Sequence, residues 1–253
     1  MSAGARPPAE RIPAKQRHAP LRLRAVERTQ RAMKDQWYGD KRDLVKWGVL
    51  LRLAHLYGAS RILQVAYYGE SAWGWLEIDG QPKPMDEVVI DHFRNIRNIR
   101  KLTAQPRIDV ITSPFSDRQR YTQEILREIA SSGDKSIVFL DPDTGLEPQG
   151  KAGLKHVRES ELLQIWAGMR AGDVLVLYQH QTNRNARPWT DSKRAQFERA
   201  LGLPPATAKV ARAAKVPSNS GMVQLARDVV FFYCQKPPCG KPTGLAEATQ
   251  PDR

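Results

Sequence analysis

Residues 137–145 of the chain read Ile-Val-Phe-Leu-Asp-Pro-Asp-Thr-Gly, and this stretch decides the fold. A continuous apolar run is typical of a buried parallel strand, and ligands of open α/β sheets bind just past the carboxyl ends of such strands. We therefore predict a strand over Ile137–Asp141. Asp141 and Asp143 are then expected at a functional edge of the sheet.

A second apolar run, Asp173–Tyr178, follows the helical stretch Glu159–Arg170 and leads into Gln179 and His180. A strand, a crossover helix and a strand form a βαβ unit with parallel strands. Because sequential parallel strands are usually neighbours, we expect both acidic residues and the Gln-His pair to share one edge of the sheet.

Elsewhere along the chain, helix and strand patterns alternate. We expect a hairpin-like excursion over 69–81, an antiparallel pair formed by the last two strands, and Gly58 just past the end of the first helix. This order predicts an α/β fold with a Rossmann-like, methyltransferase-type, mostly parallel sheet flanked by helices. The expected helices span 41–57, 86–102, 117–131, 159–170 and 190–201, and the expected strands span 61–67, 108–112, 137–141, 173–178, 208–212 and 229–234.

The charge is large and unevenly spread. The 253 residues carry a formal net charge of +13, and residues 1–35 hold nine Lys or Arg against three acids, so 9 − 3 = +6. We predict a disordered basic arm over 1–35, an α/β domain over 36–235 and a flexible tail over 236–253. The charge favours a polyanionic partner, most simply nucleic acid, although an Arg-rich proteome or a need for solubility produces the same composition.

The sequence contains no apolar run of the roughly 20 residues that a membrane span requires, and no secretory apolar region near its start. We therefore expect a soluble, cytoplasmic protein without a membrane partner. Cys234 and Cys239 alone cannot complete a four-ligand zinc site, so we expect reduced thiols.

Residues 38–47 read Tyr-Gly-Asp-Lys-Arg-Asp-Leu-Val-Lys-Trp at the expected start of the first helix. An N-cap at Asp40 and a first-turn carboxylate at Asp43 explain both acids structurally. Lys46 lies on an otherwise apolar helix and needs a partner, either an acid or a bound anionic ligand. For the ligand-binding interpretation we assign Tyr38, Gly39, Asp40, Asp43 and Lys46 to a cofactor.

The turn after the strand over Ile137–Asp141 also has two interpretations. Its proline and glycine can shape a structural turn, and His180 can be a packed side chain. Alternatively, two carboxylates one residue apart can hold a divalent cation or orient a substrate amine. We predict Asp141 and Asp143 as catalytic groups and His180 as an acid-base or orienting group. The substrate-binding candidates are Thr144, Gly145, Gln179 and Arg184.

Three motifs carry a resemblance to known families: Tyr-Gly-Asp-x-x-Asp-x-x-Lys-Trp, Asp-Pro-Asp-Thr-Gly and Tyr-Gln-His-x-x-x-Arg. Together they resemble the signature of a widespread, uncharacterised bacterial family. More distantly, the chain resembles ribosomal RNA adenine-N6 methyltransferases. The matches are Gly39, Asp43, Leu44 and Lys46 to their Gly-Asn-x-Ala-Asp-Val-Leu-Lys-His motif, and Asp141 and Pro142 to the start of their Asp-Pro-Pro-Tyr motif.

The methyltransferase resemblance implies a fold that binds S-adenosylmethionine, with Lys46 near the cofactor and Asp141 near the reacting amine. The chain departs from these enzymes at two places. The first strand runs into Val-Ala-Tyr-Tyr-Gly-Glu (65–70) without a glycine-spaced turn. Asp143 and Thr144 replace the Pro-Tyr that stacks on a flipped base.

We predict an S-adenosylmethionine-dependent, methyltransferase-like protein that acts on or binds nucleic acid, and two other classes stay open. A metal-dependent nuclease or phosphodiesterase would use Mg²⁺ or Mn²⁺ at Asp141 and Asp143, because this turn resembles the acidic motif of Toprim domains, with Glu70 as the earlier acid. A non-catalytic nucleic-acid-binding module would use charge alone. At helical spacing Arg94, Arg97 and Lys101 form a basic face that is either solvated or in contact with phosphates.

Overall fold

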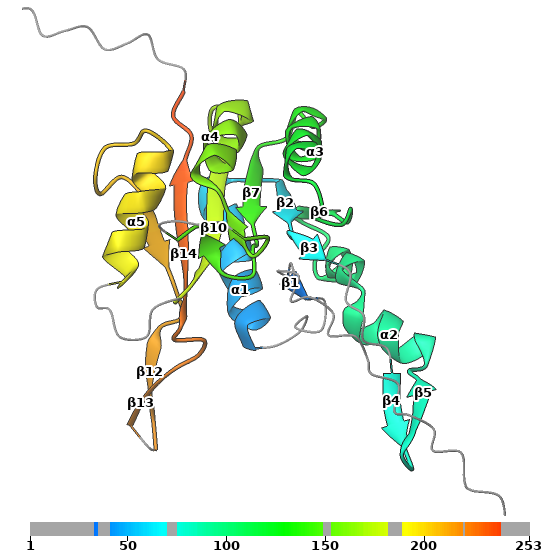
Figure 1. The fold of residues 1–253 in the computed structure, drawn as a ribbon. Helices are drawn as coiled ribbons and strands as arrows, with labels where there is room; N and C mark the ends of the chain where they lie inside the picture. Colours follow the sequence, from blue (N-terminus) through cyan, green and yellow to red (C-terminus); the bar gives the residue numbers. More distant parts are fainter. Residues whose placement is uncertain are drawn as a thin grey trace, which may run out of the picture.

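The structure is a computed structural model that describes residues 33–34, 41–69, 75–148, 153–181, 189–219 and 221–238. Within these residues the main sheet has six strands in the order β11-β14-β10-β7-β2-β6 (Figure 1). Strand β14 runs antiparallel to both of its neighbours, whereas β10, β7, β2 and β6 pair in parallel. The strands are β2 (Arg61–Val65), β6 (Arg107–Ile111), β7 (Ser136–Leu140), β10 (Val174–His180), β11 (Lys209–Ala211) and β14 (Val229–Gln235).

This strand order, with one inverted strand inserted near the edge, confirms the predicted Rossmann-like, methyltransferase-type α/β fold. The βαβ unit is confirmed as well, because β7 and β10 pair directly in parallel. The predicted antiparallel pair at the end of the chain is formed by β11 and β14.

Helices cover both faces of the sheet. Helix α1 packs on one face, and α3, α4 and α5 pack on the other. Successive residues of a strand point to opposite faces, so Ile62 and Phe139 pack in the α1 core, whereas Leu63 and Val138 pack in the core beneath the other three helices. The helices are α1 (Lys41–Tyr57), α2 (Glu87–Arg94), the 3₁₀ helix η2 (Ile96–Lys101), α3 (Arg118–Ala130), α4 (Glu159–Gly168) and α5 (Trp189–Ala200).

Four pairs of short strands lie outside the main sheet. Two of them are antiparallel ribbons that project from the body below the sheet in the view of Figure 1. The ribbons are β4–β5 (Trp75–Ile78 with Gln81–Pro84), which is the predicted excursion, and β12–β13 (Lys215–Ser218 with Gly221–Gln224). The others are the two-residue parallel pairs β1–β3 (Met33–Lys34 with Tyr68–Gly69) and β8–β9 (Gly145–Leu146 with His156–Val157).

Helix ends follow local sequence signals. Gly58 lies just past α1 with a φ of 61°, the left-handed conformation that glycine adopts at low cost, and the Ala59 amide donates to the Ala54 carbonyl at 2.9 Å. The prediction of one helix over 86–102 is wrong, because Asn95 divides it into α2 and η2. Asn95 is extended and its side chain accepts a hydrogen bond from the Arg97 amide, which is the competition with the helix that asparagine favours.

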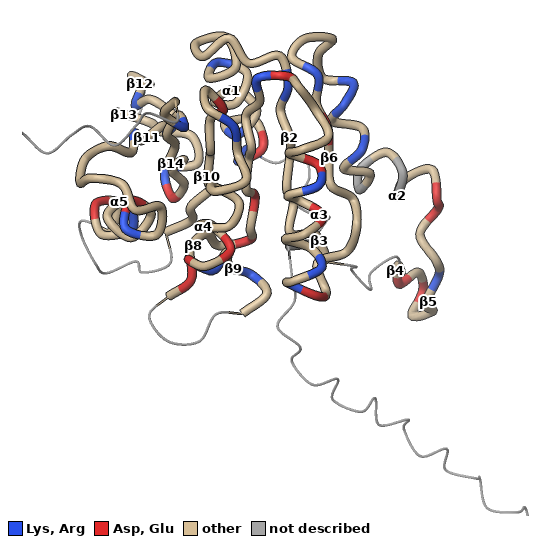
Figure 2. Tube along the Cα trace, turned by 90° about the horizontal axis from the view of Figure 1, so that it is seen from above, with Lys and Arg blue, Asp and Glu red and all other residues tan. Residues whose placement is uncertain are grey.

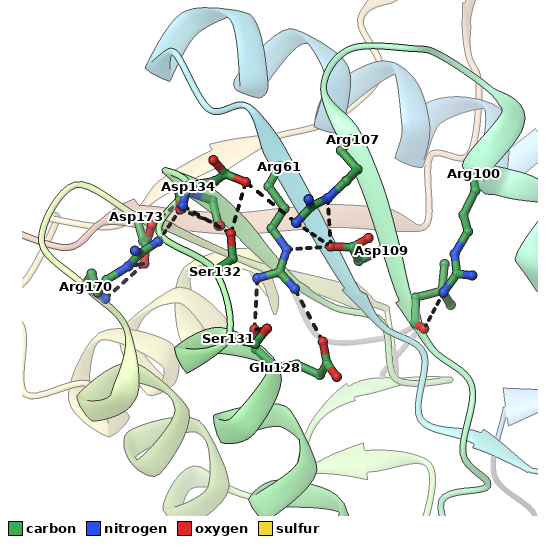
Figure 3. Close-up of polar contacts among 12 residues, drawn as sticks. Arg61, Arg100, Arg107, Asp109, Glu128, Ser131, Ser132, Asp134, Arg170 and Asp173 are labelled. Carbon is green, nitrogen blue, oxygen red and sulfur yellow. Dashed lines mark hydrogen bonds and ion pairs between the residues drawn. The ribbon is translucent and has the colours of Figure 1, made fainter.

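A polar network joins the amino-terminal ends of the central strands (Figure 3). Arg61 is the first residue of β2, and its side chain is only 2% exposed. It donates to Asp109 Oδ2 at 2.7 Å and to the Glu128 carbonyl at 2.9 Å. Asp173, before β10, accepts from the Ser136 amide at the start of β7. These contacts fix the edge of the sheet that is opposite to the predicted site.

Several predictions fall on residues that are not described. Residues 1–32 and 35 of the predicted arm and 239–253 of the predicted tail lie outside the described ranges, whereas Met33–Lys34 pairs with Tyr68–Gly69. Cys234 is a free, buried thiol whose pKa is raised to about 12 by burial, and Cys239 is not described. None of the helices in the described ranges combines the length and apolarity that a membrane crossing requires.

Candidate functional site

A group of polar side chains lies where β2 and β7 end, on the α1 face of the sheet. Gln64 and Ile62 are two residues apart in β2, and Asp141 and Phe139 are two residues apart at the end of β7, so the polar side chains follow the α1-facing apolar ones. From β2 the chain continues to β6 on one side, while β7 lies on the other side. This reversal is the topological switch point at which open α/β sheets bind their ligands.

Lys46 from α1 is the centre of the group. Its Nζ donates to Asp43 Oδ1 at 2.7 Å and to Asp141 Oδ2 at 2.8 Å. Gln64 Nε2 also donates to Asp141 Oδ2, at 3.0 Å, and the Lys46 ammonium lies 5.5 Å from the centroid of the Tyr178 ring. The partner that the sequence required for Lys46 is therefore a pair of acids.

Burial and charge act against each other in this cluster. Burial alone would lower the pKa of Lys46, but the charges and hydrogen bonds of Asp141 and Asp43 outweigh it and raise that pKa well above its ordinary value. Burial raises the pKa of Asp141 despite the opposing effect of Lys46. Burial also raises the pKa of Tyr178. Lys46 is therefore held firmly as a cation.

Two buried oxygens of the cluster accept no hydrogen bond from the residues that the structure describes. They are Asp141 Oδ1 and Gln64 Oε1, and both side chains are almost completely buried. A buried acceptor without a donor is costly, so a native structure normally supplies one from protein, water or a ligand. The pair of oxygens suits a ligand that carries N–H donors.

A second polar group lies at the carboxyl end of β10. His180 Nε2 lies 2.9 Å from Asp228 Oδ2, and the same oxygen accepts from the Arg42 guanidinium at 2.7 Å. Burial tends to raise the pKa of Asp228, but Arg42, a backbone hydrogen bond and His180 together outweigh burial and lower that pKa. Tyr178 lies two residues before His180 on the same face of β10, and its ring centroid is 5.5 Å from Lys46 Nζ, so it lies beside both groups.

The other candidate residues in the turn after β7, together with Gln179, stabilise a loop and do not join the cluster around Lys46. Asp143 pairs with Lys155 at 3.1 Å, and Thr144 Oγ1 donates to the Lys155 carbonyl at 2.8 Å. Gln179 Nε2 donates to the carbonyls of Thr144 and His180, and its Oε1 accepts from the Leu146 amide. Gln179 is fully buried beside Gly145. The described hydrogen bonds of the Gln179 side chain are therefore all to backbone groups.

Some predicted residues cannot be placed. Tyr38, Gly39, Asp40, Glu70 and Arg184 lie outside the described residues, and the side chain of Arg94 is also not described. Of the predicted basic face, Arg97 and Lys101 belong to a 3₁₀ helix with three residues per turn. That geometry aligns Arg97 with Arg100 instead.

Four residues of the site were not among the sequence candidates: Arg42, Gln64, Tyr178 and Asp228. Gln64 had a signal, since it is a polar residue inside an otherwise apolar buried strand. Tyr178 precedes two candidates and shares its face with His180. Arg42 lies within the motif over 38–47. Asp228 had no such signal, because its approach to His180 depends on the pairing of β14 with β10.

The turn after β2 is made without glycine. Tyr67 adopts a φ of 46°, a left-handed conformation that costs a non-glycine residue roughly 1–2 kcal/mol. Its ring packs against Phe115 and Tyr121 on the face opposite Asp141. Strained backbone of this kind is concentrated at functional sites. The chain therefore makes a sharp turn at the end of β2 where dinucleotide-binding folds use glycine.

Metal ligands do not gather in the described part of the chain. There, no group of three or more His, Cys, Asp or Glu side chains is arranged to hold an ion. The nuclease alternative also requires Glu70, which is not described.

The fold and the position of the polar cluster together define a Rossmann-like α/β protein of the methyltransferase type. No protein-family model matches the sequence, and a search of curated proteins found no match. Among solved structures, the chain is similar to a DUF574 family protein from Streptomyces avermitilis, with 11% identity, a TM-score of 0.38 and coverage of 78% of this chain and 82% of that one. It is also similar to a "putative O-methyltransferase" from Klebsiella pneumoniae, with 15% identity, a TM-score of 0.30 and coverage of 76% and 80%. Both TM-scores are low, so strand order and site geometry carry the functional conclusions.

Proposed function

We propose that the protein binds S-adenosylmethionine at the ends of β2 and β7 and is a methyltransferase that acts on nucleic acid. The observation that carries the proposal is the pair of buried acceptors, Asp141 Oδ1 and Gln64 Oε1, at the switch point of a methyltransferase-type sheet.

The residues present suit this methyl donor. S-adenosylmethionine carries an ammonium group, whose N–H donors would satisfy two buried oxygens to which no described residue donates. When bound, it supplies an electrophilic methyl group. Lys46 keeps Asp141 in place through the 2.8 Å ion pair, and Gln64 fixes the same carboxylate from β2. The role of these side chains is to bind and orient the donor.

A nucleic-acid acceptor is the second part of the proposal. The formal net charge of +13 supports a polyanionic substrate, since clustered Lys and Arg bind phosphates through the release of counterions. Tyr178 and His180 lie beside the cluster at the end of β10. They are the side chains that we assign to positioning the acceptor.

The test is a calorimetric titration of the full chain with S-adenosylmethionine in EDTA. We expect micromolar binding by the wild type and a loss of at least about tenfold for Asp141→Asn, because a hydrogen bond to a charged group contributes roughly 1.5–3 kcal/mol. Asp143→Asn is the matched control, since Asp143 pairs with Lys155 instead. We expect it to bind like the wild type.

Two results would overturn the cofactor assignment. One is the absence of any heat of binding when S-adenosylmethionine is titrated into wild-type protein whose folding is verified by circular dichroism. The other is an equal effect of the two substitutions, which would show that the Asp141 carboxylate makes no specific contact with the donor. Release of nucleotides only in the presence of Mg²⁺ or Mn²⁺ would favour the nuclease alternative.

A further inference from the structure

The two projecting ribbons have the same architecture but different chemistry. All described residues of β12–β13 are exposed except Gln224, which is partly buried. Their register pairs Val216 with Val223 and Pro217 with Met222, so apolar side chains face solvent on both sides of the ribbon. An isolated two-stranded hairpin is only marginally stable in water. A ribbon of this kind gains order from a partner.

Charge distinguishes the ribbons and indicates what the partner is. Arg212, Lys215 and Arg227 are exposed at and beside β12–β13, and none of them pairs with a carboxylate of the described chain. The β4–β5 ribbon carries Glu77 and Asp79 in addition to one lysine. Figure 2 shows basic residues at β12–β13, and both acidic residues and a basic one at β4–β5. A polyanion therefore complements β12–β13 and is repelled by the acidic side chains of β4–β5.

The base of the basic ribbon touches the candidate site. Arg227 directly precedes Asp228, whose carboxylate contacts His180 and Arg42. The Gln181 amide also donates to the Asp228 carbonyl at 2.8 Å. A molecule held along the ribbon therefore lies next to the end of β10, on the same edge of the sheet as Asp141.

Shape selects the kind of polyanion. The major groove of B-form DNA admits a two-stranded β-ribbon, and its thymine methyl groups accept apolar contacts of the kind that Val216 or Met222 offers. The major groove of A-form RNA is too narrow for side chains to read. We propose that β12–β13 is a docking ribbon for duplex DNA, in which Arg212, Lys215 and Arg227 contact phosphates. This inference deepens the proposed function, on which it rests for a nucleic-acid substrate.

The experiment measures fluorescence anisotropy of the full chain with a labelled DNA duplex of roughly two helical turns, about 20 base pairs. The single strand and an RNA duplex of the same sequence serve as competing probes. The test variant replaces Arg212, Lys215 and Arg227 by alanine. The matched control replaces Arg97, Arg100 and Lys101 by alanine, which removes the same charge from the rival basic surface on η2.

We expect the ribbon variant to lose at least about tenfold in affinity for the DNA duplex and the control to lose much less. Between about 50 and 200 mM salt the wild type should lose about 40-fold more affinity than the ribbon variant, because each phosphate contact steepens the log–log dependence by about 0.9. Equal losses in the two variants, or a wild-type preference for the RNA duplex or the single strand, would overturn the proposal.

Failure of this inference is distinguishable from failure of the cofactor assignment. The anisotropy is measured without S-adenosylmethionine, and the ribbon variant is titrated with S-adenosylmethionine separately. DNA binding that depends on the ribbon, in a protein that gives no heat with the methyl donor, supports the ribbon and overturns the cofactor. Binding of the methyl donor without DNA binding that depends on the ribbon supports the cofactor assignment and overturns the ribbon proposal.

Discussion

Lys46 is a buried cation whose position is determined by two carboxylates, and its replacement should lower the stability of the fold. Lys46→Met leaves Asp141 buried without its ion-pair partner, so we expect the free energy of unfolding at about pH 7 to fall by roughly 3 kcal/mol. Lys41→Met is the control, because Lys41 is exposed at the start of the same helix. Urea unfolding of both variants measures the difference. A loss no larger than that of Lys41→Met would show that the ion pair contributes little.

The same substitution makes a pH prediction with a defined sign. The pKa of Lys46 is raised in the folded state, so its stabilisation is complete below the ordinary lysine value of 10.5 and is lost as the pH rises above that value. The pKa of Asp141 is also raised, so its contribution favours folding at low pH and is lost as the pH rises from 3.8 through its folded value. The wild type should therefore lose more stability than Lys46→Met above about pH 10.5, and the gap between them should shrink as the pH is lowered, because protonation relieves the unpaired Asp141.

At the scale of elements, two glycines of similar appearance in the sequence have opposite roles. Gly145 in β8 has a φ of 111°, and a Cβ there would lie 2.3 Å from Gln179, whose side chain is held by three backbone hydrogen bonds. Gly145→Ala should therefore lower the free energy of unfolding by roughly 2 kcal/mol or more. Gly48 in α1 is exposed with open space around it, so Gly48→Ala should raise the free energy of unfolding by about 1 kcal/mol through helix propensity.

Thermal unfolding of the two alanine variants distinguishes packing from propensity. The midpoint should fall for Gly145→Ala and rise for Gly48→Ala. A fall for both would mean that the middle of α1, at Gly48, does not tolerate a more rigid backbone.

The elements show which features a sequence can predict. Continuous apolar runs predicted β7 and β10 because both faces of a central strand are buried, and the helix spacing predicted α4 between them. The division at Asn95 was missed, because the apolar pattern continues across this residue, whereas its extended backbone ends α2 and its side chain caps η2. Lys46 and Asp141 were recognised as candidates by their local setting. Their direct contact was not predicted, since it depends on how α1 packs across β2 and β7.

The alternation of side chains along a strand explains why the candidate residues at the predicted sheet edge point to two different faces of the sheet. We expected Asp141, Asp143, Gln179 and His180 along one edge, and all four do follow β7 or lie at the end of β10. Gln179, however, points to the face opposite Tyr178 and His180, as the two-residue period of a strand requires. That period is readable from the sequence. The identity of the partners on each face is not, because helices from distant parts of the chain supply them.

Viewed as a whole, the molecule uses the two edges of its sheet differently. The carboxyl-terminal edge carries buried acceptors to which none of the described residues donates, and strained backbone at Tyr67; both features reduce stability. At the amino-terminal edge, Arg61 has hydrogen bonds from β2 to both β6 and α3. A division of this kind predicts that substitutions at the amino-terminal edge change stability without changing ligand binding.

Arg61 and Arg107 test this division, because both donate to the same oxygen of Asp109 (Figure 3). The Arg61 side chain is 2% exposed and that of Arg107 is 55% exposed. Arg61→Met should lower the free energy of unfolding by roughly 3 kcal/mol, and Arg107→Met by at most about 1 kcal/mol, since solvent screens an exposed pair. At a temperature where both variants are folded, each should bind S-adenosylmethionine like the wild type in the calorimetric titration. A weaker affinity in Arg61→Met alone would show that the amino-terminal edge also positions the site, and that the two edges do not act independently.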